Sequence, residues 1–428
     1  MSLPHIAYAG MTHLGLCSAV AASHQGARTL GFDPDATRIG RIAVGALPVC
    51  EPGLDDLLHA HRDRIAFSAD ATGLRDCDLI YVAADVPTDA AGVSDLREID
   101  ALLDLVLVHA RADATIVILS QVPPGFTRAR QRPGRSIQYQ VETLVFGRAV
   151  ERATRPERFV LGCVDPARPL PSAWQRFLAS FGCPLLPMRL ESAELAKISI
   201  NCALAASVTI ANTLAELCER VGADWAEIAP ALKLDARIGQ HAYLAPGLGL
   251  AGGNIERDLA TVLRLSDEHG TDAGAIRAVV ANSRHRKDWA FRELQDALLA
   301  NMPDARLGAL GLAYKENTDS VKNSAALQLI AQLTPWPVRV FDPIVPASAA
   351  VHPNVTAAPS ALEAARGVDA LAIMTPWPEF RRLAPADLAT VMRGRLILDP
   401  YRVLDAAAAR TAGLDHRMLG VHSGERSR

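Results

Sequence analysis

The chain lacks the spacings and runs that mark several classes of protein. Its seven cysteines, at positions 17, 50, 77, 163, 183, 202 and 218, include no CxxC pair. We therefore expect no metal site and no disulfide framework, and a reducing cytoplasm as the compartment. No run reaches the ~18 apolar residues of a membrane span, and no signal peptide is visible. The formal net charge of −3 shows no basic excess, so we expect no nucleic acid as a partner. We also expect no membrane partner.

Length and hydrophobic pattern indicate more than one domain. The 428 residues exceed a single core, and 50% of them are hydrophobic. Up to about residue 190, short apolar stretches alternate with helical ones, as in a parallel sheet wrapped by helices. One long helix is expected from Glu191 to Val221, and more helix to about residue 299. Strands are expected at 5–9, 27–32, 78–83, 114–120, 159–163 and 184–188, then in a second series at 307–312, 338–341, 370–374 and 396–398.

This order predicts an α/β fold with two Rossmann-like domains joined by a long central helix and a helical domain. We place the three domains at 1–190, 191–300 and 301–428. Linker composition is inconspicuous, so the boundaries follow the change of pattern alone.

A glycine-containing turn follows the first expected strand. Gly10-Met-Thr-His-Leu-Gly15 has the spacing of the dinucleotide motif G-x-G-x-x-G, and Asp33 ends the second strand. Asp33 can bind the adenosine ribose hydroxyls, which favours NAD over NADP. Thr12 replaces the second glycine, so its Cβ should crowd the phosphates, although its hydroxyl can donate a hydrogen bond. The motif also fits an ordinary strand–helix turn, and both interpretations stay open here.

Two further segments carry candidate chemistry. Lys197 and Asn201 are four residues apart and lie on one face of the expected long helix. An ammonium and an amide directed at one cavity can hold a water and stabilise an alkoxide. Residues 246–258 combine a Gly-rich turn with Asp258 where a helix should start. The alternative for the Lys–Asn pair is a solvated stripe.

Together these segments resemble the UDP-glucose/GDP-mannose dehydrogenase family. The ordered set 197–201, 237–239 and 246–258 is similar to its substrate site, 51–54 matches its EPGL motif, and 120–125 resembles its STVPPGT motif. The resemblance covers nearly the whole chain. In that family a cysteine of the Gly-rich segment attacks a sugar aldehyde, and Asn254 occupies this position here.

The resemblance assigns roles to the domains and to single residues. Domain 1–190 should bind NAD, 191–300 should form a homodimer and contribute to the substrate site, and 301–428 should bind a nucleoside diphosphate sugar. The implied catalytic residues are Lys197, Asn201, Asp258, Glu142 and Asn254. Those implied for the cofactor are Gly10, Thr12, Gly15, Asp33, Pro87, Ser120 and Lys322, and those for the substrate are Arg237, Tyr243, Gly247, Tyr314, Lys315 and Arg402.

Several replacements surround the expected reacting centre. Gln121 stands where the family has a threonine, and Phe146 replaces the second glutamate of a motif that keeps Glu142. Asn254 cannot form the family's thioester, and no cysteine follows Cys218. Cys202 lies about 140° around the helix from Lys197, so we expect it to pack rather than react.

The interpretation that follows is a nucleotide-sugar 6-dehydrogenase-like enzyme of polysaccharide or sugar-nucleotide biosynthesis. It would perform one alcohol-to-aldehyde oxidation, or two through a hydrated aldehyde with no covalent step. The alternative is a catalytically silent protein that binds a nucleotide sugar or scaffolds other enzymes. A 6-phosphogluconate-type dehydrogenase would share the catalytic lysine but would not explain residues 237–258 or the second α/β domain.

Overall fold

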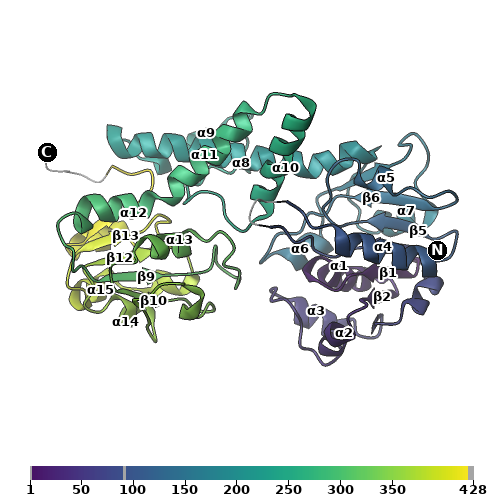
Figure 1. Cartoon of the computed structure of the whole chain (residues 1–428), viewed down its shortest axis with the longest axis horizontal. Helices are drawn as coiled ribbons and strands as arrows, with labels where there is room; N and C mark the ends of the chain where they lie inside the picture. The colour runs from purple at the N-terminus through teal and green to yellow at the C-terminus, as the bar shows by residue number, and fades with distance from the viewer. Residues whose placement is uncertain (1, 90–92, 423–428) are drawn as a thin grey trace. The chain divides into compact units, whose positions relative to one another are not determined.

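The computed structural model describes residues 2–89 and 93–422 (Figure 1). The chain divides into two compact units, Met1–Ile200 and Asn201–Arg428. Helix α8 (Leu190–Val221) contains the boundary between them. The three-domain division therefore stays a prediction.

An eight-stranded sheet forms the first unit, in the order β3-β2-β1-β4-β5-β6-β7-β8. The order reverses at β1, and this switch point is where open α/β sheets bind ligands. All neighbouring strands are parallel except β6 and β7, which are antiparallel and depart from the parallel pattern expected. The strands are β1 (Ile6–Ala9), β2 (Thr29–Phe32), β3 (Ile65–Ser68), β4 (Leu79–Val82), β5 (Thr115–Ile118), β6 (Ser136–Gln140), β7 (Phe159–Cys163) and β8 (Leu185–Arg189).

Helices cover both faces of this sheet, because β1, β4 and β5 are apolar on both sides and fully buried. One core cluster packs α1 and α7 against the sheet, and a second packs α4. The helices of the unit are α1 (His13–His24), α2 (Ala36–Ala43), α3 (Leu54–Ala60), α4 (Arg97–His109), α5 (Phe126–Ala129), α6 (Ala149–Thr154) and α7 (Ser172–Ala179).

The second unit contains a six-stranded parallel sheet in the order β11-β10-β9-β12-β13-β14. Within this unit, Figure 1 shows α9, α10 and α11 gathered on one side and the sheet with α13, α14 and α15 on the other. The strands are β9 (Leu307–Leu310), β10 (Val338–Phe341), β11 (Val355–Ala357), β12 (Ala370–Ile373), β13 (Leu396–Leu398) and β14 (Asp415–Arg417). The helices are α9 (Trp225–Leu234), α10 (Asn254–His269), α11 (Gly274–Lys287), α12 (Trp289–Leu294), α13 (Ala325–Gln332), α14 (Ala361–Ala365), α15 (Pro385–Val391) and α16 (Ala406–Thr411).

All ten expected strands are present, and four others were not expected. β3, β11 and β14 are short strands at sheet edges, and β14 consists of three polar residues. β6 contains Ser136, Gln138 and Gln140, so it lacks the apolar run of a buried strand although most of it is buried. Hydrogen bonding to a neighbouring strand, rather than local composition, makes these segments strands.

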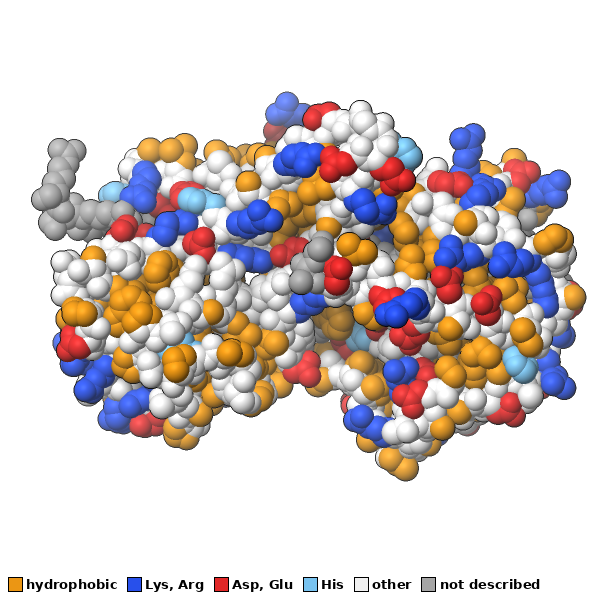
Figure 2. All heavy atoms as spheres, viewed as in Figure 1, with side chains coloured by type: hydrophobic (Ala, Val, Ile, Leu, Met, Phe, Trp, Pro, Cys, Tyr) orange, Lys and Arg blue, Asp and Glu red, His pale blue; other side chains and the backbone are white. Residues whose placement is uncertain are grey.

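One face of α8 carries buried polar side chains. Glu194, Lys197 and Asn201 follow helical spacing and are 0%, 9% and 8% exposed. The Glu194 carboxylate accepts hydrogen bonds from the backbone N–H groups of Gly125 and Thr127, at 2.6 and 2.8 Å. By length and composition α8 also meets the requirements of a bilayer span, a test that core helices of soluble proteins pass as well. Figure 2 shows acidic and basic side chains interspersed on the visible surface.

Replacing Glu194 by Ala should lower the free energy of unfolding of the first unit by about 2–4 kcal/mol, because two backbone donors lose a charged acceptor. Urea denaturation followed by circular dichroism measures the change. Glu191→Ala is the matched control on the same helix. Glu191 pairs with Arg128 at the surface, so its loss should cost less than about 1 kcal/mol. Equal losses in the two variants would contradict this account.

Candidate active site

The turn between β1 and α1 fits the close approach of a dinucleotide. Gly10 has φ +100°, and a Cβ there would meet Ala84 at 2.8 Å. A Cβ on Gly15 would lie 1.7 Å from the Gly10 carbonyl oxygen, so α1 packs against the turn only with glycine at this position. Both glycines therefore have the steric roles that the sequence predicts.

Asp33 fixes this turn from the end of β2. Its carboxylate, 1% exposed, accepts hydrogen bonds from the backbone N–H groups of Met11 and Asp35 at 2.7 and 2.9 Å. Arg38 donates to the same carboxylate at 2.7 Å. Asp33 is therefore held in place at the switch point of the sheet, where an adenosine ribose is bound in such folds.

Thr12 and Ser120 both bond to the segment that follows β4. Thr12 precedes α1, and its hydroxyl accepts a hydrogen bond from the backbone N–H of Asp85 at 2.8 Å. Buried Ser120 donates its hydroxyl to the Ala84 carbonyl at 2.6 Å. Pro87 is exposed further along, and its carbonyl accepts from the Asp95 N–H. These predicted cofactor residues lie together around the carboxyl ends of β1, β4 and β5.

Glu142 and Lys197 form a buried ion pair in the first unit. Lys197 Nζ lies 2.7 Å from Glu142 Oε1, and the two side chains are 11% and 14% exposed. Glu142 also accepts the backbone N–H of Leu144 at 2.8 Å. The pair joins α8 to the loop after β6, so the structure brings these two predicted catalytic residues together.

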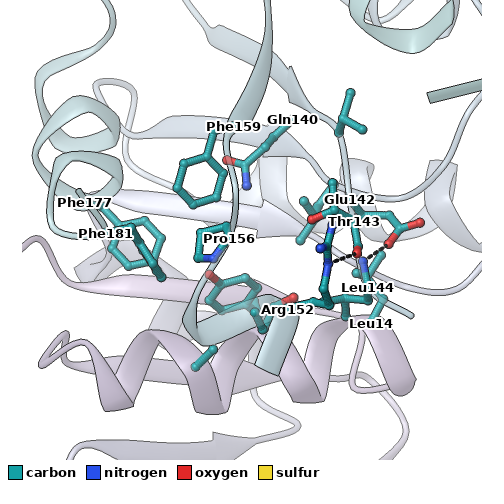
Figure 3. Close-up of a pocket in the computed structure, with 16 residues that line it drawn as sticks. Leu14, Gln140, Glu142, Thr143, Leu144, Arg152, Pro156, Phe159, Phe177 and Phe181 are labelled. Carbon is teal, nitrogen blue, oxygen red and sulfur yellow. Dashed lines mark hydrogen bonds between the residues drawn. The ribbon is translucent and has the colours of Figure 1, made fainter. Parts of the chain in front are cut away.

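A small cavity lies beside that loop. Its volume is about 50 Å³, and Figure 3 shows Phe159, Phe177 and Phe181 at one end, with Glu142 and Arg152 at the other. Arg152 donates to the Thr143 carbonyl, which holds the loop over the cavity.

Asn201 and Asp258 form the second predicted pair, within the second unit. The Asn201 side-chain amide donates to Asp258 Oδ2 at 2.5 Å, and both residues are buried. Arg257, 5% exposed, lies 3.4 Å from the other Asp258 oxygen. Lys197 precedes Asn201 by one turn of α8, so this helix carries the partner of each carboxylate that the sequence predicts to be catalytic.

Asn254 is the first residue of α10, after a turn built from Gly252 and Gly253. Both glycines have φ near +90°, and added Cβ atoms would clash with the Tyr314 ring and the Lys322 stem. Gly252 donates its N–H to the Lys322 carbonyl at 3.0 Å. Tyr314 is predicted to bind the substrate and Lys322 the cofactor. Both pack against the same turn that precedes Asn254.

The predicted substrate cations are engaged in different ways. Arg237 pairs with neighbouring Asp235 at 2.7 Å while its side chain is 89% exposed. Arg402 pairs with Asp224 at 2.6 Å, and Lys315 Nζ lies 5.7 Å from the Tyr314 ring centre. Gly247 donates its N–H to buried Asn212, and Tyr243 is half exposed. The structure thus brings Lys315 to Tyr314 but places Arg237 on an exposed loop.

Sequence reasoning missed a buried cluster around His13. His13 Nε2 lies 2.7 Å from Glu51 Oε1, and Phe146 stacks on the His13 ring with centres 4.2 Å apart. Glu51 also accepts the N–H groups of Gly147 and Ala149. The cluster joins the start of α1 to the loop that follows Glu142. Its only signals in the sequence were the EPGL match at Glu51 and the Phe146 replacement.

A second missed residue is Tyr401, which lies beside the Gly-rich segment. A Cβ on Gly247 would meet its ring at 3.9 Å. Burial raises the pKa of Tyr401 to about 12, although a hydrogen bond from the Leu248 backbone acts in the opposite direction. Its phenol is therefore neutral at physiological pH.

Cys202, the cysteine next to Asn201, is poorly suited to act as a substitute nucleophile. Burial, with a smaller contribution from the charge of Asp258, raises the pKa of Cys202. A raised pKa disfavours the reactive thiolate. This agrees with the packing role expected for Cys202.

The sheet with its switch point, the glycine turn and the buried acid–amide pair are features of a nucleotide-dependent dehydrogenase. Three models of the UDP-glucose/GDP-mannose dehydrogenase family match the chain: its NAD binding domain at residues 4–173, its central domain at 191–284 and its UDP binding domain at 308–406. The chain belongs to this family.

Individual relatives agree over nearly the full length. The chain is 28% identical to a UDP-glucose 6-dehydrogenase of Rickettsia prowazekii over 97% of its residues and 99% of the relative. It is also 28% identical to UDP-glucose 6-dehydrogenase TuaD of Bacillus subtilis, over 97% and 93%. The structure of a UDP-glucose dehydrogenase from Pyrobaculum islandicum superposes with a TM-score of 0.83, at 27% identity and over 95% and 98% of the two chains. The predicted family, two-Rossmann α/β fold, nucleotide-sugar dehydrogenase class and NAD cofactor are confirmed.

Glu51 gives the first unit an acid-sensitive contact. Burial favours its protonated form, but the His13 ring and the N–H groups of Gly147 and Ala149 outweigh burial and lower its pKa. Because the pKa is lower in the folded protein, ionised Glu51 stabilises the fold at pH values above its ordinary pKa of 4.5. This contribution is lost as pH falls through the folded-state pKa. Glu51→Gln should therefore reduce stability by about 2 kcal/mol at neutral pH, with the difference shrinking below pH 4.5.

Thermal unfolding across this pH range measures the effect. Asp104→Asn is the control, since Asp104 is exposed on α4 of the same unit. A deficit in Glu51→Gln that stays constant with pH would contradict the assignment.

Proposed function

We propose that the protein is an NAD-dependent nucleotide-sugar 6-dehydrogenase that oxidises UDP-glucose or a related sugar at C6 without a covalent thioester. The buried Asn201–Asp258 pair, one helical turn from Lys197, is the observation that carries the proposal. Asp258, Asn201 and Lys197 supply an acid, an amide and an ammonium for alcohol oxidation. Asn254 stands in place of the thiol. A cytoplasmic role in polysaccharide or sugar-nucleotide biosynthesis is part of the proposal.

Oxidation of the C6 alcohol to an aldehyde removes one hydride and one proton. NAD, when bound, supplies the hydride acceptor. Lys197 would stabilise the developing alkoxide, and Asp258 would accept the proton through a water held with Asn201. Glu142, 2.7 Å from Lys197, would balance the ammonium charge.

A second oxidation is possible without a thiol if water adds to the aldehyde. Loss of a proton and a hydride from the resulting hydrate gives the acid. Asn254 would donate its amide to the aldehyde or hydrate oxygen from the first position of α10, where backbone N–H groups also favour negative charge. The chain would therefore release aldehyde or form acid slowly.

A cavity of about 310 Å³ in the second unit supports a nucleotide-sugar ligand. Pro246, Tyr401 and Arg402 line it, together with Trp225 and Lys233. Two cations beside two aromatic rings suit a diphosphate and a base. Arg402 would exchange its contact with Asp224 for the ligand.

A homodimer through α8 is a further part of the proposal. Ile210, Leu217 and Val221 are 57%, 54% and 64% exposed on this helix, and Figure 2 shows hydrophobic side chains at the surface of the helical layer. Exposed apolar stripes of this kind favour association. The partner subunit would place its copy of the Arg237 loop near the ligand.

A catalytically silent nucleotide-sugar-binding or scaffolding protein is the second candidate. The observation that favours it is the replacement of the nucleophile by Asn254 while the ligand-holding cations remain. The two candidates are distinguished by turnover: the first oxidises a nucleotide sugar and forms NADH, and the second does not.

NADH formation by the purified protein over a panel of nucleotide sugars, with product masses, tests the function. We expect one NADH per sugar with released aldehyde, or slow acid formation insensitive to thiol reagents. Lys197→Ala should lower kcat by at least about 100-fold because the alkoxide loses its cation. Asn254→Cys should speed the second oxidation. Arg264→Ala, which removes an exposed cation of α10 paired with Glu268, should retain the parent rate.

A protein-linked sugar thioester trapped by mass spectrometry in the parent chain would refute the non-covalent route. Binding without turnover on every sugar would instead favour the silent protein.

Arg237→Ala should weaken UDP-glucose binding by about 1.5–3 kcal/mol, the scale of a charged hydrogen bond. Calorimetry measures this loss, and light scattering checks that the proposed dimer persists. Arg410→Ala, at an exposed position of α16, is the control and should bind like the parent. Unchanged affinity in Arg237→Ala would remove this residue from the site.

A further inference from the structure

A carboxylate already lies at the end of α1 that faces the cofactor turn. Asp85 Oδ2 accepts the backbone N–H of Leu14 at 3.3 Å. Leu14 is in the first turn of α1 (His13–His24), where backbone N–H groups have no partner within the helix. These N–H groups, with the helix dipole, are the donors that a dinucleotide pyrophosphate uses in a Rossmann fold.

Thr12 holds Asp85 in this position. The Thr12 hydroxyl accepts the backbone N–H of Asp85 at 2.8 Å, while the Asp85 carboxylate reaches back to Leu14. The two bonds close a ring across the turn, at the motif position where the second glycine would leave no side chain. Ser120, bonded to the neighbouring Ala84 carbonyl at 2.6 Å, fixes the same segment from β5.

We propose that Asp85 is an internal competitor for the cofactor pyrophosphate and sets the affinity of this protein for NAD. The inference rests on the proposed use of the α1 turn by NAD. A pyrophosphate that bonds to the first turn of α1 must displace the carboxylate, because two anions this close repel each other at the effective dielectric constant of a protein surface. Asp85 is exposed, so it can move into solvent, and the cost is a weaker affinity rather than a blocked site.

Asp85→Asn tests the charge while keeping the size of the side chain and the backbone N–H that bonds to Thr12. Isothermal titration with NAD, ADP and adenosine separates phosphate contacts from base and ribose contacts. We expect Asp85→Asn to bind NAD and ADP about tenfold more tightly and adenosine as the parent does. Raising salt from about 0.05 to about 0.5 M should shrink the gain, because salt screens exposed charges.

Two further variants test whether the gain in NAD affinity comes from the Asp85 charge at α1 or from removing any negative charge nearby. Asp89→Asn removes the same charge from the same segment, but that carboxylate bonds to the Val93 N–H, so its NAD affinity should stay within about twofold of the parent. Thr12→Gly should also tighten NAD binding, and adding Asp85→Asn to it should yield less than the sum of the two separate gains.

If the parent binds NAD and Asp85→Asn binds it no more tightly, the Asp85 proposal is wrong but the proposed cofactor site stands. The same holds if Asp85→Asn binds adenosine more tightly by the same factor as NAD. If neither chain binds NAD or ADP, the proposed cofactor site fails and this inference fails with it. A parent that binds adenosine but little NAD, beside an Asp85→Asn variant that binds NAD well, would establish the competition in its strongest form.

Discussion

The polar face of α8 is the constraint on which the rest of the candidate site depends. Glu194 on this face binds the turn after β5, Lys197 pairs with Glu142, and Asn201 donates to Asp258. Further along the same face, Asn212 accepts the N–H of Gly247 in the Gly-rich segment. Because an α-helix fixes the spacing of these side chains, α8 positions Glu142 within the first unit and Asp258 within the second.

Buried charge requires such partners. Glu194, Lys197 and Asp258 are nearly inaccessible, and an isolated charge in that environment would be strongly destabilising. Each is satisfied by backbone N–H groups, an opposite charge or an amide. The polar groups of the site are therefore preorganised, which is what electrostatic stabilisation of an alkoxide needs.

The changes around the reacting centre form connected sets rather than scattered losses. Phe146, where the resemblance predicts a glutamate, stacks on His13, and His13 pairs with Glu51. Thr12, where a glycine is expected, holds the segment of Asp85. Asn254, predicted to stand at the position of the family's cysteine, places a polar side chain at the start of α10. Both the cofactor turn and the loop beside Glu142 are thus tied to protein partners.

The sequence by itself determined the family, the order of elements and ten of the strands, because periodicity and steric requirements such as those at Gly10 and Gly15 are local. It also placed Lys197 and Asn201 on one face of a helix. Only the tertiary structure decided that Asn201 meets Asp258, 57 residues away, and that Asp85 lies at α1, 71 residues from Leu14. Those contacts depend on strand order and loop closure, which no local pattern encodes. The four missed strands have the same cause, since pairing with a neighbour rather than their own composition makes them strands.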